Sequence, residues 1–191
     1  MYPNGINRPV KDSTSPPLRT LSEINRLDQR QFVEILGPLF EHSPWIAERT
    51  WSARPFADRA SLHRTLCETV AHANEAEKLS LLRAHPDLVG RAALAGTLTA
   101  SSTKEQASAG LDNLTTQEIA QFQQYNRDYQ EKFDFPFIIC ARLNKKEAIL
   151  AGFVSRLQNS HAQELETALG EVSKIAWLRL CDVVAESHEA Q

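Results

Sequence analysis

The stretch SHAQELETALGEVSKIAWLRLCDVVA, residues 160–185, decides the fold class of this chain. Apolar residues recur in it at steps of three and four, the spacing that places them on one buried face of an α-helix. These residues are Leu165, Leu169, Val172, Ala176 and Val183. The pattern therefore predicts a long helix from about Ser160 to Ala185.

Helical periodicity continues over nearly all of the remaining chain. Helix starts are predicted at Asp28, Ser43-Pro44, Asp58, Asn74, Thr115-x-x-Glu118 and Asn144-x-x-Glu147. The spacing of the last two is that of a capping box, in which two side chains satisfy free backbone N–H groups. The sequence shows no alternating strand pattern and no glycine-rich phosphate loop, so the predicted fold class is all-α.

One segment interrupts the helical pattern. FDFPFIICARL, residues 133–143, is dense in Phe and Ile, and Pro136 forbids a regular helix interior. We expect an extended, buried segment whose unpaired backbone groups need partners. A flat ligand with several amides would supply them, and core packing by the same side chains is compatible with this. The predicted architecture is a compact single-domain helical bundle with one extended buried segment.

Length and composition argue against a nucleic-acid-binding protein and against a membrane-spanning one. The chain has 191 residues and a formal net charge of -3, which argues against a nucleic-acid surface. No apolar run approaches the roughly 20 residues that a membrane span needs. Residues 1–20 are rich in Pro, Ser, Thr and Asn, which predicts a flexible tail before a helical domain over residues 21–191. Cys67, Cys140 and Cys181 form no CxxC pair, which is typical of reduced thiols in a cytoplasmic protein.

Arg179 falls on the apolar stripe of the last helix, between Ala176 and Val183. A guanidinium keeps its proton, so burial without a partner is costly. Two interpretations stay open from spacing alone. Arg179 forms an internal salt bridge or reaches water along its stem, or it anchors an anionic ligand in a pocket.

Glu105 also has two interpretations. Ser102-x-x-Glu105 has the spacing of a capping box, so Glu105 would tie back to the start of its helix. A helix N-terminus also offers free N–H groups to oxygen ligands, and Glu105 with Gln106 would then line a site.

His85 stands directly before Pro86 where a helical pattern stops, in the stretch HPDLVGR, residues 85–91. Proline disfavours the helical region for the residue before it, so the chain turns extended there. An imidazole in that place is a catalytic group, a cap that complements the helix dipole, or a metal ligand. The metal alternative uses Asp87 and needs a second, remote histidine that the sequence does not select. No HExxH or tight Cys/His cluster occurs, so no metal site is expected.

Several motifs together resemble one known family. FEHSPWIAERTW, LLRAHPDLVGR, GTLT followed by STKEQASAGLD, FDFPFIICARL and the WLRL of the last helix occur in this order. The set is similar to the 2-oxo-4-hydroxy-4-carboxy-5-ureidoimidazoline (OHCU) decarboxylases, which complete the conversion of urate to allantoin. The resemblance covers roughly residues 21–185. It implies an all-α, cofactor-independent and homodimeric enzyme that yields (S)-allantoin.

The resemblance also assigns roles to residues. It implies that His85 is the catalytic acid/base, Glu105 the functional carboxylate and Arg179 the cationic anchor. The residues implied to bind substrate are Pro86, Ser102, Thr103, Lys104, Glu105, Gln106, Phe137, Ile138, Ile139, Cys140, Ala141 and Arg179. The chain departs from the family pattern at Asp134, where FGFPF is usual, and at Val89, where HPDLAG is usual.

Two other functions remain as alternatives. The first is a metal-dependent enzyme that uses His85 and Asp87. The second is a non-catalytic helical module that binds a partner through the last helix, which requires an exposed apolar face over residues 165–183.

Overall fold

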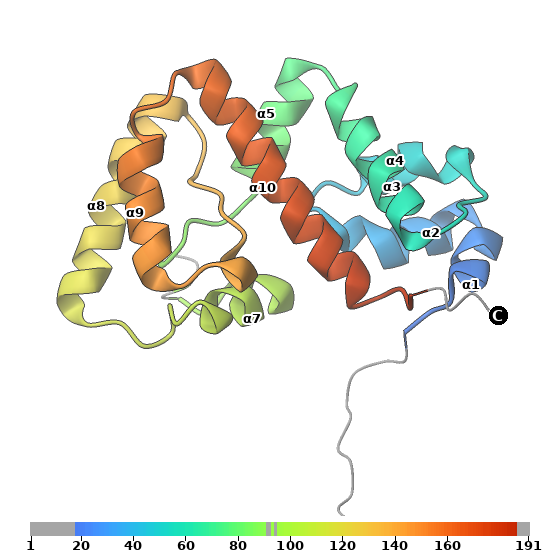
Figure 1. Cartoon of the computed structure of the whole chain (residues 1–191), viewed down its shortest axis with the longest axis horizontal. Coiled ribbons are helices and arrows are strands. Elements are labelled where there is room, and N and C mark those ends of the chain that lie inside the picture. The colour runs from blue at the N-terminus through green and yellow to red at the C-terminus, as the bar shows by residue number, and fades with distance from the viewer. Residues whose placement is uncertain (1–17, 91–92, 94, 187–191) are drawn as a thin grey trace, which may run out of the picture.

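Helices form nearly all of the regular structure (Figure 1). The structure is a computed structural model that describes residues 18–90, 93 and 95–186. Its helices are α1 (Leu21–Arg26), α2 (Gln29–Leu36), η1 (Gly37–Leu39), α3 (Trp45–Thr50), η2 (Trp51–Ala53), α4 (Arg59–Ala71), α5 (Glu75–Arg83), α7 (Ala100–Ser108), α8 (Thr116–Phe133), η3 (Ala141–Leu143), α9 (Lys146–Arg156) and α10 (His161–Cys181). Within the described residues the only β-type pairing is an isolated bridge between Arg19 and Val184. The predicted all-α class is confirmed.

Side-chain caps fix most helix starts. The capping boxes lie at Thr20, Asp28, Asp58, Asn74, Thr115 and Ser160. Each satisfies backbone N–H groups that the first helical turn leaves free. The box predicted at Asn144 is wrong, because α9 starts one residue later and the Asn144 amide donates to the Cys140 carbonyl at 3.0 Å. Pro44 precedes α3 as its cap and is not its first helical residue.

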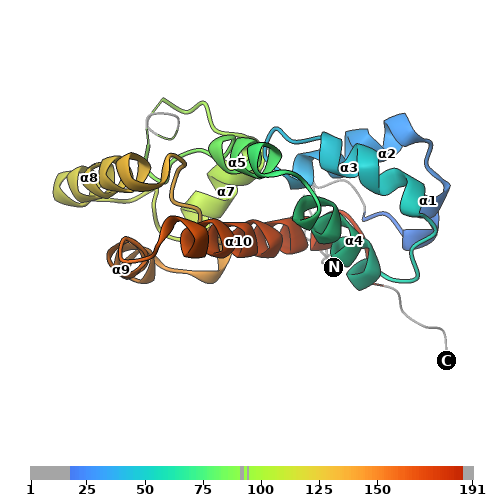
Figure 2. The same cartoon turned by 90° about the horizontal axis from the view of Figure 1, so that it is seen from above.

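Helix α10 runs diagonally through the middle of the molecule (Figure 1). In Figure 2, α5 and α7 lie along one of its sides, while α8 and α9 are grouped at one end and α1–α4 at the other. The predicted stripe is rotated: Leu165, Leu169 and Val183 are only half-buried. The buried face consists of Glu164, Ala168, Val172, Ile175, Ala176, Arg179 and Leu180. Arg179 therefore lies on the face that packs inward, and the helix ends at Cys181, before the predicted Ala185.

The predicted extended segment is present between α8 and η3, over residues 134–140. Its Phe135 and Phe137 pack on Tyr129 of α8, and Phe137 stacks on Phe153 of α9 with 3.8 Å between ring centroids. The guanidinium of Arg156 lies 4.4 Å above the Phe137 ring. This aromatic packing holds the segment against the core without a sheet.

Both ends of the described chain meet beside the end of α10. The Arg19 N–H donates to the Val183 carbonyl at 2.9 Å, and the Ala185 N–H donates to the Arg19 carbonyl at 2.8 Å. Most of the predicted tail, residues 1–17, lies outside the described residues. No helix in the described part of the chain is long and apolar enough to cross a membrane.

Candidate active site

His85 is buried at the exit of α5. Its Nδ1 lies 2.9 Å from the Leu81 carbonyl oxygen. A carbonyl only accepts, so Nδ1 carries the hydrogen and Nε2 keeps its lone pair in the neutral ring. Burial lowers the pKa of His85 below its ordinary 6.5, although the Leu81 hydrogen bond and the charge of Glu41 oppose the shift. The imidazole is therefore a neutral proton acceptor near pH 7.

Arg179 projects from the inner face of α10 and binds two carboxylates. Its Nε and Nη2 donate to Glu105 at 2.8 and 2.7 Å, and its Nη1 donates to Glu41 at 2.9 Å. Burial opposes the guanidinium charge, but these two carboxylates outweigh it and raise the pKa of Arg179. The internal salt bridge expected as one alternative exists, and it lies at the wall of a cavity.

Glu105 belongs to this ion pair and not to a cap. Helix α7 begins at Ala100, and its cap is Thr99, whose hydroxyl accepts the Ser102 N–H at 3.2 Å. The capping box predicted from Ser102 and Glu105 is therefore wrong. Glu105 lies one and a half turns into the helix, where its side chain reaches Arg179 on α10.

These residues share one cavity of about 40 Å³. It is lined by His85, Pro86, Leu88, Ser102, Glu105, Gln106, Ile138, Ile139, Ala141, Ile175 and Arg179. The three side chains predicted to be catalytic come from α10, α7 and the exit of α5, and they converge here. Ser102 and Gln106 also reach it, as do Pro86 and three residues of the 137–141 segment.

The cavity is small in this structure. A buried water occupies roughly 10–15 Å³ in such measures, and small-molecule pockets usually span about 300–1,000 Å³. A second cavity of about 710 Å³ adjoins it, and both are lined by Glu105 and Arg179. Lys104 and Arg142 line the larger space. The Arg179–Glu105 ion pair thus borders both the smaller, inner cavity and the larger, outer one.

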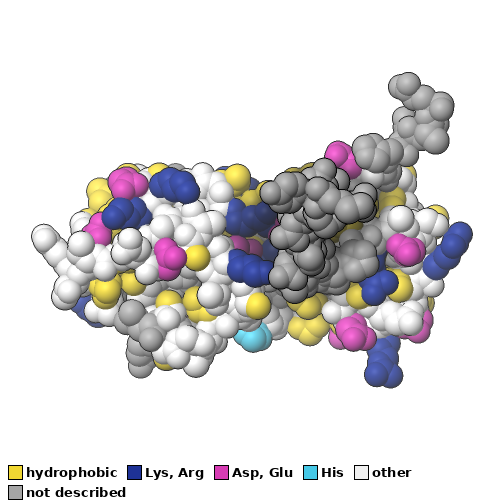
Figure 3. Space-filling view, turned by 90° about the horizontal axis from the view of Figure 1, so that it is seen from below, with side chains coloured by type: hydrophobic (Ala, Val, Ile, Leu, Met, Phe, Trp, Pro, Cys, Tyr) yellow, Lys and Arg dark blue, Asp and Glu magenta, His cyan; other side chains and the backbone are white. Residues whose placement is uncertain are grey.

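Three basic side chains, Lys104, Arg142 and Arg179, line the outer space together with the acidic Glu105 and Asp182. Figure 3 shows Lys and Arg side chains gathered near the middle of the lower face, next to a few acidic ones. Arg142 is paired there with Asp182, Nη1 to Oδ2 at 2.5 Å.

Four residues predicted to bind substrate do not line the inner cavity. Thr103 is exposed and its hydroxyl donates to the Thr99 carbonyl at 3.0 Å, while Lys104 lines only the outer space. Phe137 lies in the aromatic core, and Cys140 is buried beside Glu171. A helix and an extended segment both turn successive side chains in different directions, so a contiguous motif cannot face the cavity throughout.

Protein side chains already bind part of the extended backbone. The Cys140 N–H donates to Glu171 at 2.8 Å, and the Ile138 carbonyl accepts from Arg156 at 2.7 Å. The segment is thus held from outside, which fixes Ile138, Ile139 and Ala141 against the cavity.

Gln106 supports the loop that carries His85. Its Oε1 accepts the Val89 N–H at 3.1 Å, and its Nε2 donates to the Asp87 carbonyl at 3.4 Å. Val89, one of the departures from the family pattern, has a φ of 54°, which a β-branched residue rarely adopts. Asp87 accepts from Gln130 at 2.6 Å. Among the described residues no three His, Cys, Asp or Glu side chains form a metal-binding group around it.

Glu41 is the site residue that the sequence interpretation missed. It follows η1 and lies in FEHSPW, which was quoted only for the resemblance. Its carboxylate accepts from Arg179, from the Thr99 hydroxyl at 3.1 Å and from the Ser102 hydroxyl at 3.3 Å. Burial opposes ionisation, but Arg179 keeps the pKa of Glu41 below its ordinary 4.5. An acid embedded among the buried Leu39 and Phe40 was the available signal.

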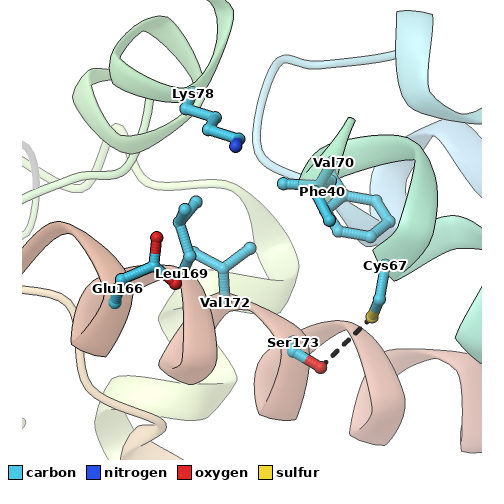
Figure 4. A pocket seen from close by; sticks show the side chains of 9 residues that line it. Phe40, Cys67, Val70, Lys78, Glu166, Leu169, Val172 and Ser173 are labelled. Atoms are coloured by element: carbon cyan, nitrogen blue, oxygen red, sulfur yellow. Dashed lines mark hydrogen bonds between the residues drawn. The ribbon is translucent and has the colours of Figure 1, made fainter. Parts of the chain in front are cut away.

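A separate cavity of about 310 Å³ lies between α4, α5 and α10 (Figure 4). Lys78 points into it from α5, and the Cys67 thiol is hydrogen-bonded to Ser173 at 3.2 Å. Burial raises the pKa of Cys67, so the thiol stays protonated and is a poor nucleophile. No predicted site residue lines this space.

A family model and the most similar known relatives point to the same protein family. The family model for OHCU decarboxylase matches residues 25–181. The chain is 42% identical over 163 residues to the OHCU decarboxylase of Haloferax volcanii, covering 85% of this chain and 95% of that protein. It is 41% identical over 170 residues to the enzyme of Mus musculus, covering 88% and 96%.

Solved structures agree on the fold. A crystal structure of (S)-allantoin synthase superposes with a TM-score of 0.67 at 27% identity, covering 86% of this chain and 54% of that one. A crystal structure of OHCU decarboxylase in the presence of (S)-allantoin gives a TM-score of 0.62 at 22% identity, covering 81% and 96%. With the matched family model and the closely similar relatives, these findings place the chain in the OHCU decarboxylase family.

Proposed function

We propose that this chain decarboxylates OHCU to (S)-allantoin, and that His85, Glu105 and Arg179 carry the reaction without a cofactor. One observation supports these roles above the others. Three polar side chains, remote along the sequence, line a single buried cavity whose remaining walls are mostly apolar. Hydrogen bonds and charges act most strongly in such a water-poor space.

The substrate itself provides the electron sink. In OHCU a ring carbon carries both a hydroxyl and a carboxylate, beside a C=N bond. When the C–C bond to the carboxylate breaks, its electron pair passes into the conjugated C=N and CO₂ leaves. The protein is then required to orient the ring, move the hydroxyl proton and protonate one face of the ring.

His85 is the proton carrier in this scheme. Its Nε2 takes the hydroxyl proton, because Nδ1–H is held by the Leu81 carbonyl. The hydroxyl carbon becomes the carbonyl, and the resulting imidazolium protonates the neighbouring carbon, formerly part of the C=N bond, from the same side, which gives one enantiomer. A proton from solvent neutralises the ring nitrogen that received the electron pair. Once the ion pair between them opens, Arg179 donates to the ureido and ring oxygens, and Glu105 orients the ring by accepting from its N–H groups.

The decisive experiment follows product formation by circular dichroism. OHCU is generated from urate by the upstream enzymes, and purified protein is added before it decays. We expect His85→Ala to lower kcat by about 10²–10⁴, the usual loss for a general acid/base. His72→Ala, at the exposed end of α4, is the matched control and keeps the wild-type rate. A wild-type rate in His85→Ala refutes the role of His85.

We further propose that the enzyme is a cytoplasmic homodimer whose catalytic unit is residues 21–191. The family resemblance supports the dimer, and three free cysteines fit a reducing compartment. Light scattering during gel filtration measures the assembly. A chain that begins at Leu18 retains the Arg19 hydrogen bonds, and we expect its kcat/KM to equal that of the full chain.

A further inference from the structure

Glu41 lies behind the active site and not in its lining. Its side chain is 3% exposed and holds Arg179, Thr99 and Ser102 together. It thereby connects the segment after η1 with the N-terminus of α7 and with α10. The residues around the inner cavity do not include it.

The two carboxylates that bind Arg179 differ in their exposure and in the number of their other hydrogen-bond partners. Glu105 is 13% exposed, lies between the inner and outer cavities, and has Arg179 as its side-chain partner. Glu41 has two hydroxyl donors besides Arg179, and its side chain is less exposed. When a ligand enters, Glu105 is therefore the carboxylate that gives way, and Glu41 is the one that stays.

We propose that Glu41 is a positioning residue, which holds Arg179 in place and partly neutralises it while Glu105 releases the guanidinium to the substrate. This inference rests on the proposed function. The geometry explains why a single arginine needs two acids. With Glu105 alone, opening the ion pair would leave a buried guanidinium without a counter-charge.

Glu41 also acts on the charge state of His85. Glu41 after η1 and Arg179 on α10 act on the charge of that imidazole, and Glu105 on α7 lines the same cavity. Arg179 disfavours the imidazolium, whereas the charge of Glu41 favours it. Removal of the Glu41 charge thus makes His85 harder to protonate.

The test compares Glu41→Gln with Glu41→Asp in the optical assay, after thermal unfolding has verified folding. Loss of a charged hydrogen bond to Arg179 in Glu41→Gln should raise KM by about tenfold or more, with a smaller change in kcat. The acidic limb of the pH–rate profile should move to lower pH. Glu41→Asp keeps the charge, so its acidic limb should stay near that of the wild type.

Glu164→Gln is the matched control, because it also removes a buried carboxylate that binds an arginine, Arg156. We expect a lower unfolding temperature and an unmoved acidic limb. If folded Glu41→Gln keeps the wild-type KM and acidic limb, the inference is overturned. If Glu41→Gln does not fold, an unchanged KM in Glu41→Asp overturns it, since that carboxylate is drawn back from Arg179.

A second measurement separates this inference from the proposed function. NMR titration of the His85 ring, assigned with His85→Asn, reports its pKa without turnover. A lower pKa in Glu41→Gln supports the inference, and an equal pKa contradicts it. A wild-type protein that is inactive on OHCU would refute the proposed function, while this titration still decides the role of Glu41.

Discussion

Arg179 joins the two acids of the site through all three of its guanidinium nitrogens. Lysine has one ammonium and cannot reproduce this planar arrangement of donors. We expect Arg179→Lys to lower kcat/KM by about 10- to 100-fold, the range for losing charged hydrogen bonds. The control is Arg49→Lys, since Arg49 is exposed and pairs with Glu77 on the surface. If Arg179→Lys shows wild-type kinetics, Arg179 does not bind the substrate and its salt bridges are purely structural.

The lowered pKa of His85 leads us to expect a smaller free energy of unfolding in mild acid. Burial places its folded pKa below 6.5, the ordinary value that it has in the unfolded chain. As the pH falls through about 6.5, the unfolded chain takes up a proton before the folded one does, so the free energy of unfolding decreases. His85→Asn retains a donor for Leu81 but does not titrate. Urea unfolding at about pH 7.5 and about pH 5.5 should show a smaller decrease for His85→Asn. Equal decreases in both proteins contradict this.

Some of the candidate site residues could be predicted from the sequence, and one could not. His85 and Arg179 were candidates from their own surroundings, one before a proline and one on an apolar stripe. Spacing alone left each with a structural alternative, and the family motifs were needed to choose. Glu41 was missed because its partners, Thr99, Ser102 and Arg179, are remote in sequence and no local pattern connects them.

At the level of elements, Asp134 explains how the chain departs from FGFPF. It ends α8 with φ 61° and ψ 22°, the left-handed conformation that favours glycine. Aspartate tolerates this conformation better than most residues, and Arg83 donates to its carbonyl at 2.9 Å. The backbone turn before Pro136 is therefore preserved with a different residue.

This turn gives a stability prediction. Asp134→Gly should raise the free energy of unfolding by up to about 1 kcal/mol, because the Arg83–Asp134 ion pair is exposed and contributes little. Asp134→Val should lower it by about 1–2 kcal/mol, since a β-branched residue is strained there. Urea denaturation measures both. A valine variant as stable as the wild type would show that the turn is not strained.

Helix starts were predicted well where the cap is purely local. Asp28, Asp58, Asn74 and Thr115 each bind a backbone N–H three residues on, as their spacing indicates. The same spacing failed for Ser102 and Glu105. There a buried guanidinium offers the carboxylate two charged hydrogen bonds, which outweigh one cap on a partly exposed turn.

For the whole molecule, the sequence predicted the class and the extended segment but not the small size of the inner cavity. An ion pair that joins α7 to α10 borders this cavity, and helical periodicity does not predict such a contact. The rotation of the buried face of α10 was missed for a related reason. Glu164 and Arg179 lie near the two ends of that face, where Arg156 and the two site acids compensate their charges.

The hydrogen bonds between Arg19 and residues 183–185 bring the two ends of the folded unit together. A short peptide that bridges Ala185 and Arg19 would therefore close the backbone into a ring without moving a helix. Opening that ring at the exposed Asp112 and Asn113, between α7 and α8, gives a circular permutant in which Glu105 follows Arg179. Such a rearranged polypeptide should still assemble the same chamber, because the side chains that line it need proximity in space and not a particular order of synthesis.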